Sequence, residues 1–234
     1  MIIRAKLEDI FRRKNINLRV HYTHFGQENT MEDFDLMARD FDTGIRIERA
    51  QVIADKIRTH IADGSTKSAM EYGCGTGLVG FQLSNEFMKL LLVDSSPEMI
   101  AQVERKLEKL GNPSMSTLCA DFIETIPQGL YVDYIFSSLV LHHIKDTEGI
   151  LHRLYDILNN AGHLLIIDLD SDDGSFHAKY PNFDGYNGFE QASLIDLVSK
   201  VGFTNVVAET FYYSNKSVNG KECPYSLFVL DAMK

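Results

Sequence analysis

Hydrophobic residues along the chain follow two alternating spacings. Short runs such as Lys89–Asp94 and His163–Leu169 are almost continuously apolar, which is typical of strands buried on both faces. Between such runs, apolar residues recur every three or four positions, as in Arg46–Ile61 and Gln191–Val201, and this spacing predicts amphipathic helices. Strands that alternate with helices are joined by right-handed crossovers into a mainly parallel sheet. The pattern therefore predicts an α/β protein.

The other elements follow the same rules. Further strands are predicted at Ser68–Tyr72, Ser114–Leu118, Tyr131–Ser137, Thr204–Phe211 and Tyr225–Asp231, and further helices at Leu78–Asn85, at Pro97–Leu110 and around Ile150–Leu158. Ser96 is a suitable N-cap, Pro97 suits the first helical position, and Gly111 ends that helix. Only about 13 residues, Tyr212–Pro224, separate the last two strands. This connection is short for a helical crossover, so we expect a hairpin with a loop there and an antiparallel last strand.

Composition restricts the function more than the fold. A chain of 234 residues fits one domain with a small appendage, and we expect an N-terminal extension and cap helix in residues 1–62 and a core domain in residues 63–234. A net charge of −10 favours partners other than nucleic acids, whose phosphates need a basic surface. Three widely spaced cysteines predict free thiols and no metal site. With no apolar run of about 20 residues, we expect a cytoplasmic protein without a membrane segment; the sequence leaves the oligomeric state open.

A glycine-rich turn, E-Y-G-C-G-T-G at residues 71–77, joins a predicted strand to a predicted helix. Glycines allow a tight turn and a close approach of backbone to ligand, and a helix N-terminus offers free N–H groups to an anion. Gly75, Gly77 and Gly80 also match the spacing of dinucleotide-binding turns. The glycines alone therefore fit either a nicotinamide cofactor or S-adenosylmethionine.

Three acidic residues help to separate these cofactors. Glu71 ends the strand before the turn, where a carboxylate repels a pyrophosphate but suits a ligand with an ammonium and a sulfonium group. Asp94 ends the next strand and can accept both ribose hydroxyls of either cofactor. Asp121 is followed by Phe122, so that a carboxylate for an adenine amino group stands beside an aromatic ring. Together these positions favour S-adenosylmethionine.

Five segments carry a family resemblance. They are E-Y-G-C-G-T-G (71–77), V-D-S-S-P-E-M (93–99), C-A-D-F (119–122), D-Y-I-F-S-S-L-V-L-H-H-I (133–144) and G-H-L-L-I-I-D (162–168). In order and spacing they resemble class I S-adenosylmethionine-dependent methyltransferases, above all the small-molecule ubiquinone and menaquinone methyltransferase type, from about Phe34 to the C-terminus. The resemblance implies a Rossmann-like methyltransferase fold: a seven-stranded sheet of order 3-2-1-4-5-7-6, strand 7 antiparallel, with helices on both faces.

The resemblance also implies a binding site for S-adenosylmethionine and for its product S-adenosylhomocysteine. Its residues lie in the turn, at the ends of the following strands and in the helix before the core: Glu71, Gly73, Cys74, Gly75, Gly77, Asp94, Ser95, Met99, Asp121, Phe122, Ser137, Ser138, Phe41 and Arg46. Arg49 is a further candidate in that helix. Arg46 is either a clamp for the methionine carboxylate or a solvated residue of the helix surface.

Methyl transfer needs chiefly orientation and a dry pocket, and a base only where the acceptor is protonated. His142 and His143 follow the fourth strand and are candidate general bases, or else histidines bonded to backbone that shape the edge of the pocket. The loop Asp170–Phe189 is rich in aromatic residues and is expected to be a lid or a packed surface loop. In it, His177, Tyr180 and Tyr186 are candidate substrate-pocket residues.

The acceptor is expected to be a small molecule. The fourth strand lacks the Asn/Asp-Pro-Pro-Tyr/Phe signature of amide and nucleic-acid nitrogen methyltransferases, and the chain has no Pro-Cys pair. Two other functions stay open: a non-catalytic S-adenosylmethionine-binding protein, and a nicotinamide-dependent oxidoreductase. Residues 1–30 are expected to form either an extra cap or a segment with little structure.

Overall fold

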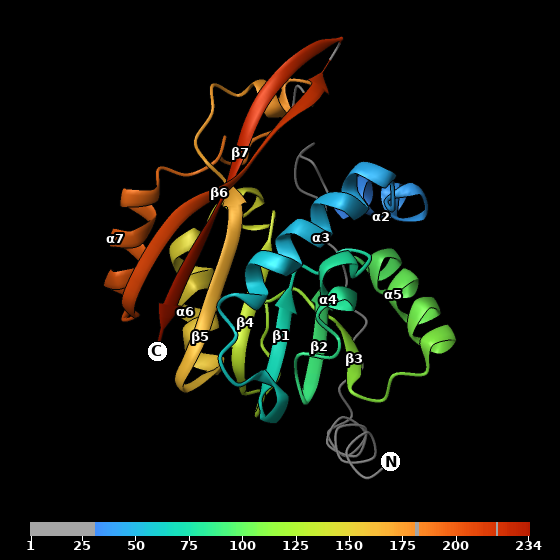
Figure 1. The fold of residues 1–234 in the computed structure, drawn as a ribbon, viewed down its shortest axis with the longest axis vertical. Helices are drawn as coiled ribbons and strands as arrows, with labels where there is room; N and C mark the ends of the chain where they lie inside the picture. The colour runs from blue at the N-terminus through green and yellow to red at the C-terminus, as the bar shows by residue number, and fades with distance from the viewer. Residues whose placement is uncertain (1–30, 181–182, 219) are drawn as a thin grey trace.

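A seven-stranded sheet forms the centre of the computed structural model, which describes residues 31–180, 183–218 and 220–234 (Figure 1). Its strands are β1 (Ser68–Tyr72), β2 (Lys89–Asp94), β3 (Met115–Cys119), β4 (Val132–Ser138), β5 (Leu158–Leu169), β6 (Thr204–Val218) and β7 (Lys221–Met233). The spatial order is β3-β2-β1-β4-β5-β7-β6, and β7 alone runs in the direction opposite to the other strands. The predicted order and antiparallel ending are confirmed. The expectation for residues 1–30 lies outside the described residues.

Helices cover both faces of this sheet (Figure 1). In chain order they are α2 (Met31–Met37), α3 (Gly44–Arg58), α4 (Leu78–Gln82), α5 (Pro97–Leu110), α6 (Thr147–Ile157) and α7 (Gln191–Val201), with single 3₁₀ turns η1 (Ala38–Asp40), η2 (Gly64–Thr66), η3 (Leu141–His143) and η4 (Ser175–His177). Helices α3, α4 and α5 pack on one face, and α6 and α7 on the other. None of the helices in the described ranges is long and apolar enough to cross a membrane.

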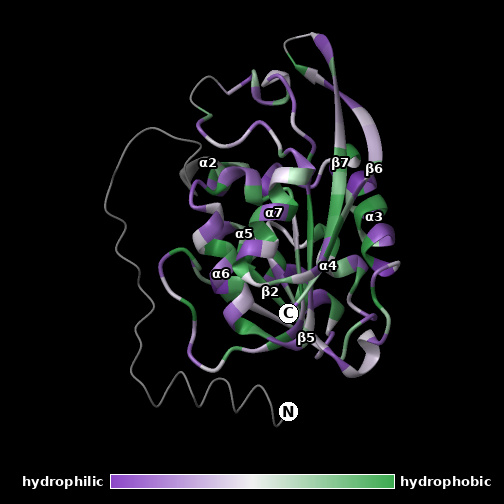
Figure 2. Ribbon diagram, turned by 90° about the vertical axis from the view of Figure 1, so that its left-hand side faces the viewer, coloured by the Kyte–Doolittle hydropathy of each residue, from purple (hydrophilic) through white to green (hydrophobic). Residues whose placement is uncertain are grey.

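Alternation along the central strands divides the core into two layers. In β4, Tyr134 and Phe136 pack under α3 and α4, whereas Ile135 between them packs under α6 and α7. In β5, Leu165 and Ile167 alternate in the same way with their neighbours. Figure 2 shows hydrophobic and hydrophilic residues alternating along the helices that cover the sheet. Strands buried on both faces therefore account for the continuous apolar runs in the sequence.

The boundaries of α5 follow the predicted capping residues. The hydroxyl of Ser96 accepts a hydrogen bond from the backbone N–H of Met99 at 3.1 Å, and Pro97 occupies the first turn. Gly111 ends the helix with a φ of +62°, in the left-handed region that favours glycine. Because Ser96 lies two residues after Asp94, the acid that ends β2, this cap also fixes the backbone beside that acid.

Strands β6 and β7 extend far beyond the rest of the sheet as a two-stranded arm (Figure 1). Strand β5 pairs with β7 only as far as Leu169 opposite Leu227, whereas β6 and β7 stay paired to Val218 opposite Lys221. The prediction of a loop over Tyr212–Pro224 was therefore wrong, although the hairpin itself is confirmed. The Asn, Ser and Lys residues that indicated a loop belong here to strands that are largely open to water, where polar side chains carry no penalty.

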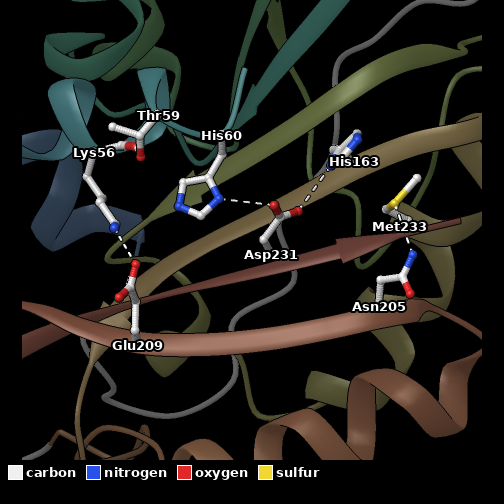
Figure 3. A network of polar contacts seen from close by, with 8 residues as sticks. All are labelled: Lys56, Thr59, His60, His163, Asn205, Glu209, Asp231 and Met233. Carbon is white, nitrogen blue, oxygen red and sulfur yellow. Dashed lines mark hydrogen bonds and ion pairs between the residues drawn. The ribbon is translucent and has the colours of Figure 1, made fainter. Parts of the chain in front are cut away.

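The C-terminal end of α3 is tied to the antiparallel strands by polar contacts (Figure 3). Asp231 of β7 binds two histidines: Nδ1 of His60, just beyond α3, lies 3.0 Å from its Oδ2, and Nδ1 of His163 in β5 lies 3.1 Å from its Oδ1. Lys56 of α3 pairs with Glu209 of β6. These contacts hold α3 across the sheet, so that its N-terminal half reaches the carboxyl edge of the parallel strands.

Candidate active site

A cavity of about 500 Å³ lies at the carboxyl edge of the sheet, where ligands of open α/β sheets bind. It is lined from four strand ends and from the cap formed by α2, η1 and α3: Phe34, Phe41, Arg46, Arg49, Ala50, Ile53, Glu71, Tyr72, Gly73, Cys74, Gly75, Thr76, Leu78, Val79, Asp94, Ser95, Met99, Ala120, Asp121, Ile123, Ser138, Leu139, Val140, His143 and Ile144. Most of the residues predicted to bind the cofactor are thus brought together around one space.

The turn after β1 needs glycine for both shape and space. Gly73 and Gly75 have φ values of +70° and +52°, and a Cβ atom on Gly73 would lie 2.4 Å from Cγ2 of Val140. Gly77 lies outside the cavity lining. It adopts a φ of +80° at the start of α4, and a Cβ atom there would lie 2.9 Å from the ring of Phe81. Its role in the described structure is therefore to turn the backbone.

The carboxylate of Asp94 holds the turn against the end of β2. Its Oδ2 accepts a hydrogen bond from the N–H of Gly75 at 2.7 Å, and its Oδ1 accepts one from the N–H of Ser96 at 2.9 Å. Burial raises the pKa of Asp94, and these backbone donors partly offset that rise. Each carboxylate oxygen can accept a second hydrogen bond, so Asp94 can also bind hydroxyl groups in the cavity. Asp121 lines the cavity after β3, with Oδ1 accepting from the N–H of Ile123 at 2.8 Å.

Glu71 is the most constrained acid of the site. It is 1% exposed, and burial raises its pKa well above its usual range. Its Oε2 lacks a hydrogen-bond partner among the described residues, although the nearby amide of Gly80 partly offsets the burial. A buried carboxylate without a full set of partners favours a cationic neighbour. The ammonium group of S-adenosylmethionine is such a cation, so this residue fits that cofactor.

The cap is fastened to the core by two aspartates. Asp35 of α2 bonds to the hydroxyl of Ser96, and Asp42 bonds to the hydroxyl of Thr76. Asp42 also pairs with Lys106 of α5 at 2.7 Å. These contacts join the segment before α3 to the turn after β1 and to the start of α5, and they close the cavity on the side away from the strands.

Two arginines of α3 face the cavity one helical turn apart. The guanidinium of Arg46 lies 4.1 Å from the ring centroid of Phe41 and donates a hydrogen bond to the carbonyl of Phe41 at 3.0 Å. Burial and then the charge of Arg49 lower the pKa of Arg46. Phe41 itself approaches the glycine turn, since its Cε1 would lie 3.7 Å from a Cβ atom on Gly75. Arg46 is therefore a half-buried residue of the site.

The two adjacent histidines after β4 differ in their surroundings. His143 lines the cavity and meets Phe34 of α2 edge to face, with ring centroids 5.3 Å apart. His142 is 3% exposed and lies behind it, where its Nδ1 is 2.5 Å from Oδ1 of Asp168 in β5. Burial, followed by the charges of His142 and His177, lowers the pKa of His143 to about 2. Of the pair, His143 is the one placed to touch a ligand.

Several predicted residues lie beside the cavity rather than on it. Phe122 is fully buried and stacks on Tyr72 with ring centroids 5.6 Å apart, and the next residue, Ile123, lines the cavity instead. Ser137 is buried and donates its hydroxyl hydrogen bond to the carbonyl of Tyr72 at 3.0 Å. Strand alternation explains the position of Ser137, because its neighbour Ser138 in β4 points to the opposite side and lines the cavity. Phe122 lies beyond the end of β3, in a turn.

The predicted substrate-pocket residues lie in the loop after β5 and outside the cavity lining. His177 is buried and stacks on Phe183 with ring centroids 3.7 Å apart. The hydroxyl of Tyr186 donates to the carbonyl of Lys145 at 3.0 Å. Tyr180 lies near the arm, where its ring centroid is 5.9 Å from Nζ of Lys216. The loop and the arm therefore form a wall next to the cavity, beyond β4 and β5.

Sequence reasoning missed some residues of the lining. Leu139 has a φ of +58°, a strained conformation for a non-glycine residue, and donates its N–H to the carbonyl of Ile167 at 2.8 Å. Nothing in the sequence signals that strain. Phe34 and Ile53 were recognisable only as apolar helix residues, because periodicity does not tell a core contact from a ligand contact. Within the described residues, no three His, Cys, Asp or Glu side chains are arranged to hold a metal ion.

Comparisons with known proteins show similarity to methyltransferases in sequence and in fold. Residues 70–164 match the family described as "Methyltransferase domain". An uncharacterised methyltransferase of Schizosaccharomyces pombe is 24% identical over 176 residues, which cover 68% of this chain and 62% of that protein. A phosphoethanolamine N-methyltransferase 2 of Haemonchus contortus, solved with phosphomonomethylethanolamine and S-adenosylhomocysteine, superimposes with a TM-score of 0.68 at 18% identity, covering 90% of this chain and 61% of that one. The predicted Rossmann-like methyltransferase fold is confirmed; the ubiquinone and menaquinone type is not singled out.

One comparison corrects the expected partners. A tRNA U34 carboxymethyltransferase of Haemophilus influenzae is 28% identical over 160 residues, covering 65% of this chain and 50% of that protein. The expectation that nucleic acid is not a partner was therefore wrong as an exclusion: the net charge of −10 describes the whole chain and says little about one surface. The chain spans only about half to three fifths of the length of these two curated relatives.

Proposed function

We propose that the protein transfers a methyl group from S-adenosylmethionine to an acceptor bound beside the end of β4, because residues 70–164 match a methyltransferase-domain family and the sheet has the order β3-β2-β1-β4-β5-β7-β6. The observation that carries the proposal is a single cavity that joins the glycine turn, Asp94 and Asp121 to His143. The strand order places these groups side by side along one edge, β3-β2-β1-β4. A cofactor that lies along the edge meets them in turn.

Each residue has a distinct task in this proposal. Asp121 binds the adenine amino group, and Asp94 binds the ribose hydroxyls while it holds the turn through Gly75. The turn and Glu71 hold the methionine moiety. When bound, S-adenosylmethionine supplies an electrophilic methyl group. The chain supplies orientation and a cavity closed by the cap, and orientation alone is worth roughly 7–11 kcal/mol of barrier in well-aligned reactions.

His143 is the residue placed to touch the acceptor. With a pKa of about 2, the imidazole of His143 is neutral at physiological pH. It can therefore accept a hydrogen bond from the acceptor, but it is not present as the imidazolium cation. His142 is a positioning residue, because both its backbone N–H and its ring are held by Asp168. This pair fixes the turn η3, from which His143 projects into the cavity.

For the acceptor, the enclosed shape of the site supports a small molecule. Phe34 of the cap reaches His143 across the cavity, and aromatic residues of the loop after β5 stand beyond it. An RNA acceptor is the second candidate, supported by the similarity to a tRNA U34 carboxymethyltransferase. In that case one nucleotide would have to enter the cavity while the rest of the RNA stays outside.

Calorimetric titration tests the cofactor assignment. The protein should bind S-adenosylmethionine and S-adenosylhomocysteine but not NADH. Asp94→Asn should weaken both adenosyl ligands about 10-fold or more, since a hydrogen bond to a charged group contributes about 1.5–3 kcal/mol. The matched control is Asp196→Asn, an exposed residue of α7. Binding of NADH alone would instead identify a nicotinamide-dependent oxidoreductase.

Transfer itself needs a second measurement. Radiolabelled S-adenosylmethionine is incubated with the protein and either a small-molecule extract or total tRNA. Label in one pool identifies the acceptor class, and loss of that label in Asp94→Asn ties it to the site. Cofactor binding without label in either pool would favour the non-catalytic binding protein.

A further inference from the structure

Two cationic side chains of α3 line the cavity, and a third, from a distant part of the chain, lies close enough for its charge to interact with theirs. Arg46 and Arg49 come from α3 and line the cavity. Lys216 comes from β6 in the arm, where its Nζ lies 3.7 Å from the ring centroid of Phe176 and donates to the carbonyl of Phe176 at 2.9 Å. The fold therefore gathers positive charge beside a cavity in a protein with a net charge of −10.

These cations are not paired with acids of the described chain. The polar contacts of Arg46 and Lys216 are to backbone carbonyls, and Arg49 makes no hydrogen bond or ion pair with a described residue. Tyr180 and then Asp42 act to raise the pKa of Arg46, and Asp42 is already paired with Lys106. The cluster therefore carries uncompensated positive charge.

The three charges also lie close enough to repel one another. Burial lowers the pKa of Lys216 to about 8, and the charges of Arg49, Arg46 and Lys179 act in the same direction. Half-buried like charges are unfavourable without a counter-charge, and an anion between them would relieve the repulsion. Arginine in addition binds carboxylate and phosphate oxygens through two parallel N–H groups.

The position of the cluster separates it from the adenosine end of the cavity. Asp94 and Asp121 follow β2 and β3 on one side of β1, whereas the arm that carries Lys216 joins the sheet beyond β5 on the other side. The loop after β5, which holds Phe176, packs against that arm (Figure 1). The positive end is thus the end at which an acceptor would enter.

We infer that Arg49 and Lys216, with Arg46 at the inner end, form a subsite for an anionic oxygen group, a phosphate or a carboxylate, of the methyl acceptor. This inference rests on the proposed methyltransferase function. The anion belongs to the acceptor and is bound together with the cofactor. Its source is either a small phosphorylated or carboxylated molecule or the phosphate backbone of an RNA.

The test uses the full-length protein saturated with S-adenosylhomocysteine, so that the carboxylate of the cofactor is already in place. Inorganic phosphate is titrated at constant ionic strength, and the thermal midpoint and ³¹P line width are recorded. We expect saturable binding in the wild type, at least 10-fold weaker binding in Arg49→Gln and Lys216→Gln, and near-normal binding in Arg49→Lys. Lys109→Gln, an exposed lysine of α5, is the matched control and should bind as the wild type does.

A second titration with a labelled single-stranded RNA distinguishes the sources. RNA binding that phosphate competes away and that Arg49→Gln weakens places the anion in RNA, whereas phosphate binding without RNA binding places it on a small acceptor. Equal phosphate binding in all variants, or none in the wild type, overturns the subsite. So does a loss of S-adenosylhomocysteine affinity in Arg49→Gln with no phosphate binding, because the arginine would then serve the cofactor alone. If wild-type protein binds phosphate but neither adenosyl ligand, the proposed function fails instead.

Discussion

The imidazole of His142 and the carboxylate of Asp168 form a buried pair that joins the end of β4 to β5. Nδ1 of His142 lies 2.5 Å from Oδ1 of Asp168, and the backbone N–H of His142 donates to Oδ2 at 3.2 Å. The N–H of Leu169 also donates to Oδ1, at 2.8 Å. Asp168 is fully buried, so every one of its partners replaces water that it lost on folding. The pair therefore holds the backbone from which His143 enters the cavity.

Weakening this pair should lower the free energy of unfolding before it affects methyl transfer. Asp168→Asn keeps the shape but removes the charge, and we expect the free energy of unfolding to fall by about 2–3 kcal/mol, as for other hydrogen bonds to buried charged groups. Urea unfolding measures it, with the exposed Asp196→Asn as the control. The double variant His142→Phe/Asp168→Asn should lose clearly less than the sum of the single variants. Strict additivity would show that the two side chains do not interact.

The glycine turn gives a second prediction, based on space. Gly73→Ala puts a Cβ atom 2.4 Å from Cγ2 of Val140 at a φ of +70°, and we expect a loss of about 3 kcal/mol from strain and overpacking together. Gly44→Ala is the matched control, because a Cβ atom there meets nothing within 4 Å and Gly44 begins α3. It should be neutral or stabilising by up to about 0.5 kcal/mol. Equal stability of the two variants in urea unfolding would contradict the strained turn.

The sequence predicts the sheet well because burial on both faces leaves a strong local signal. β2 and the apolar end of β5 are continuous hydrophobic runs, and Ser96 and Gly111 mark the ends of α5 as expected. The arm is the exception. Its strands are held by hydrogen bonds to each other with much of their surface in water, so the polar residues of Tyr212–Pro224 indicate a loop in the sequence and form strands in the structure.

The site was predictable where the chain itself carries a motif. The turn, Asp94 and Asp121 sit at strand ends that the sequence marks clearly, and they meet because parallel strands end at the same edge. Arg49 and Lys216 are 167 residues apart, and no local pattern relates them. Which of two adjacent histidines faces the cavity is likewise decided by the partner, Asp168, which draws His142 inward.

Glu71 yields a prediction in which stability and binding move in opposite directions. Burial raises its pKa in the folded protein, so its charged form is disfavoured there, and stability is lost as pH rises from the unfolded pKa through the folded one. Glu71→Gln removes this charge. We expect the ligand-free variant to be at least as stable as the wild type at pH 8, with a smaller fall in stability between pH 4 and pH 8, but to bind S-adenosylhomocysteine more weakly. Chemical unfolding and calorimetry on the same samples measure both effects. Stronger binding together with lower stability would contradict the assignment.

The pH dependence of stability should also carry the signature of His143. Burial, and then the neighbouring His142 and His177, lower its pKa to about 2, whereas an ordinary histidine titrates near 6.5. As pH falls below 6.5, the His143 side chain therefore binds a proton in the unfolded chain but not in the folded protein. The stabilisation is fully present above pH 6.5 and is lost as pH falls from 6.5 towards 2. Between pH 7 and pH 5 the loss should amount to about 2 kcal/mol.

His143→Phe isolates that contribution. Phenylalanine keeps an aromatic ring against Phe34, and we expect the slope of unfolding free energy between pH 5 and pH 7 to decrease by the amount that His143 contributes. Urea unfolding at pH 5, 6, 7 and 8 measures it, with His152→Gln, an exposed histidine of α6, as the control. An unchanged slope would mean that His143 takes up a proton in the folded state. A decreased slope means that His143 is neutral throughout this range, and any acidic limb in the pH profile of methyl transfer must then belong to another group.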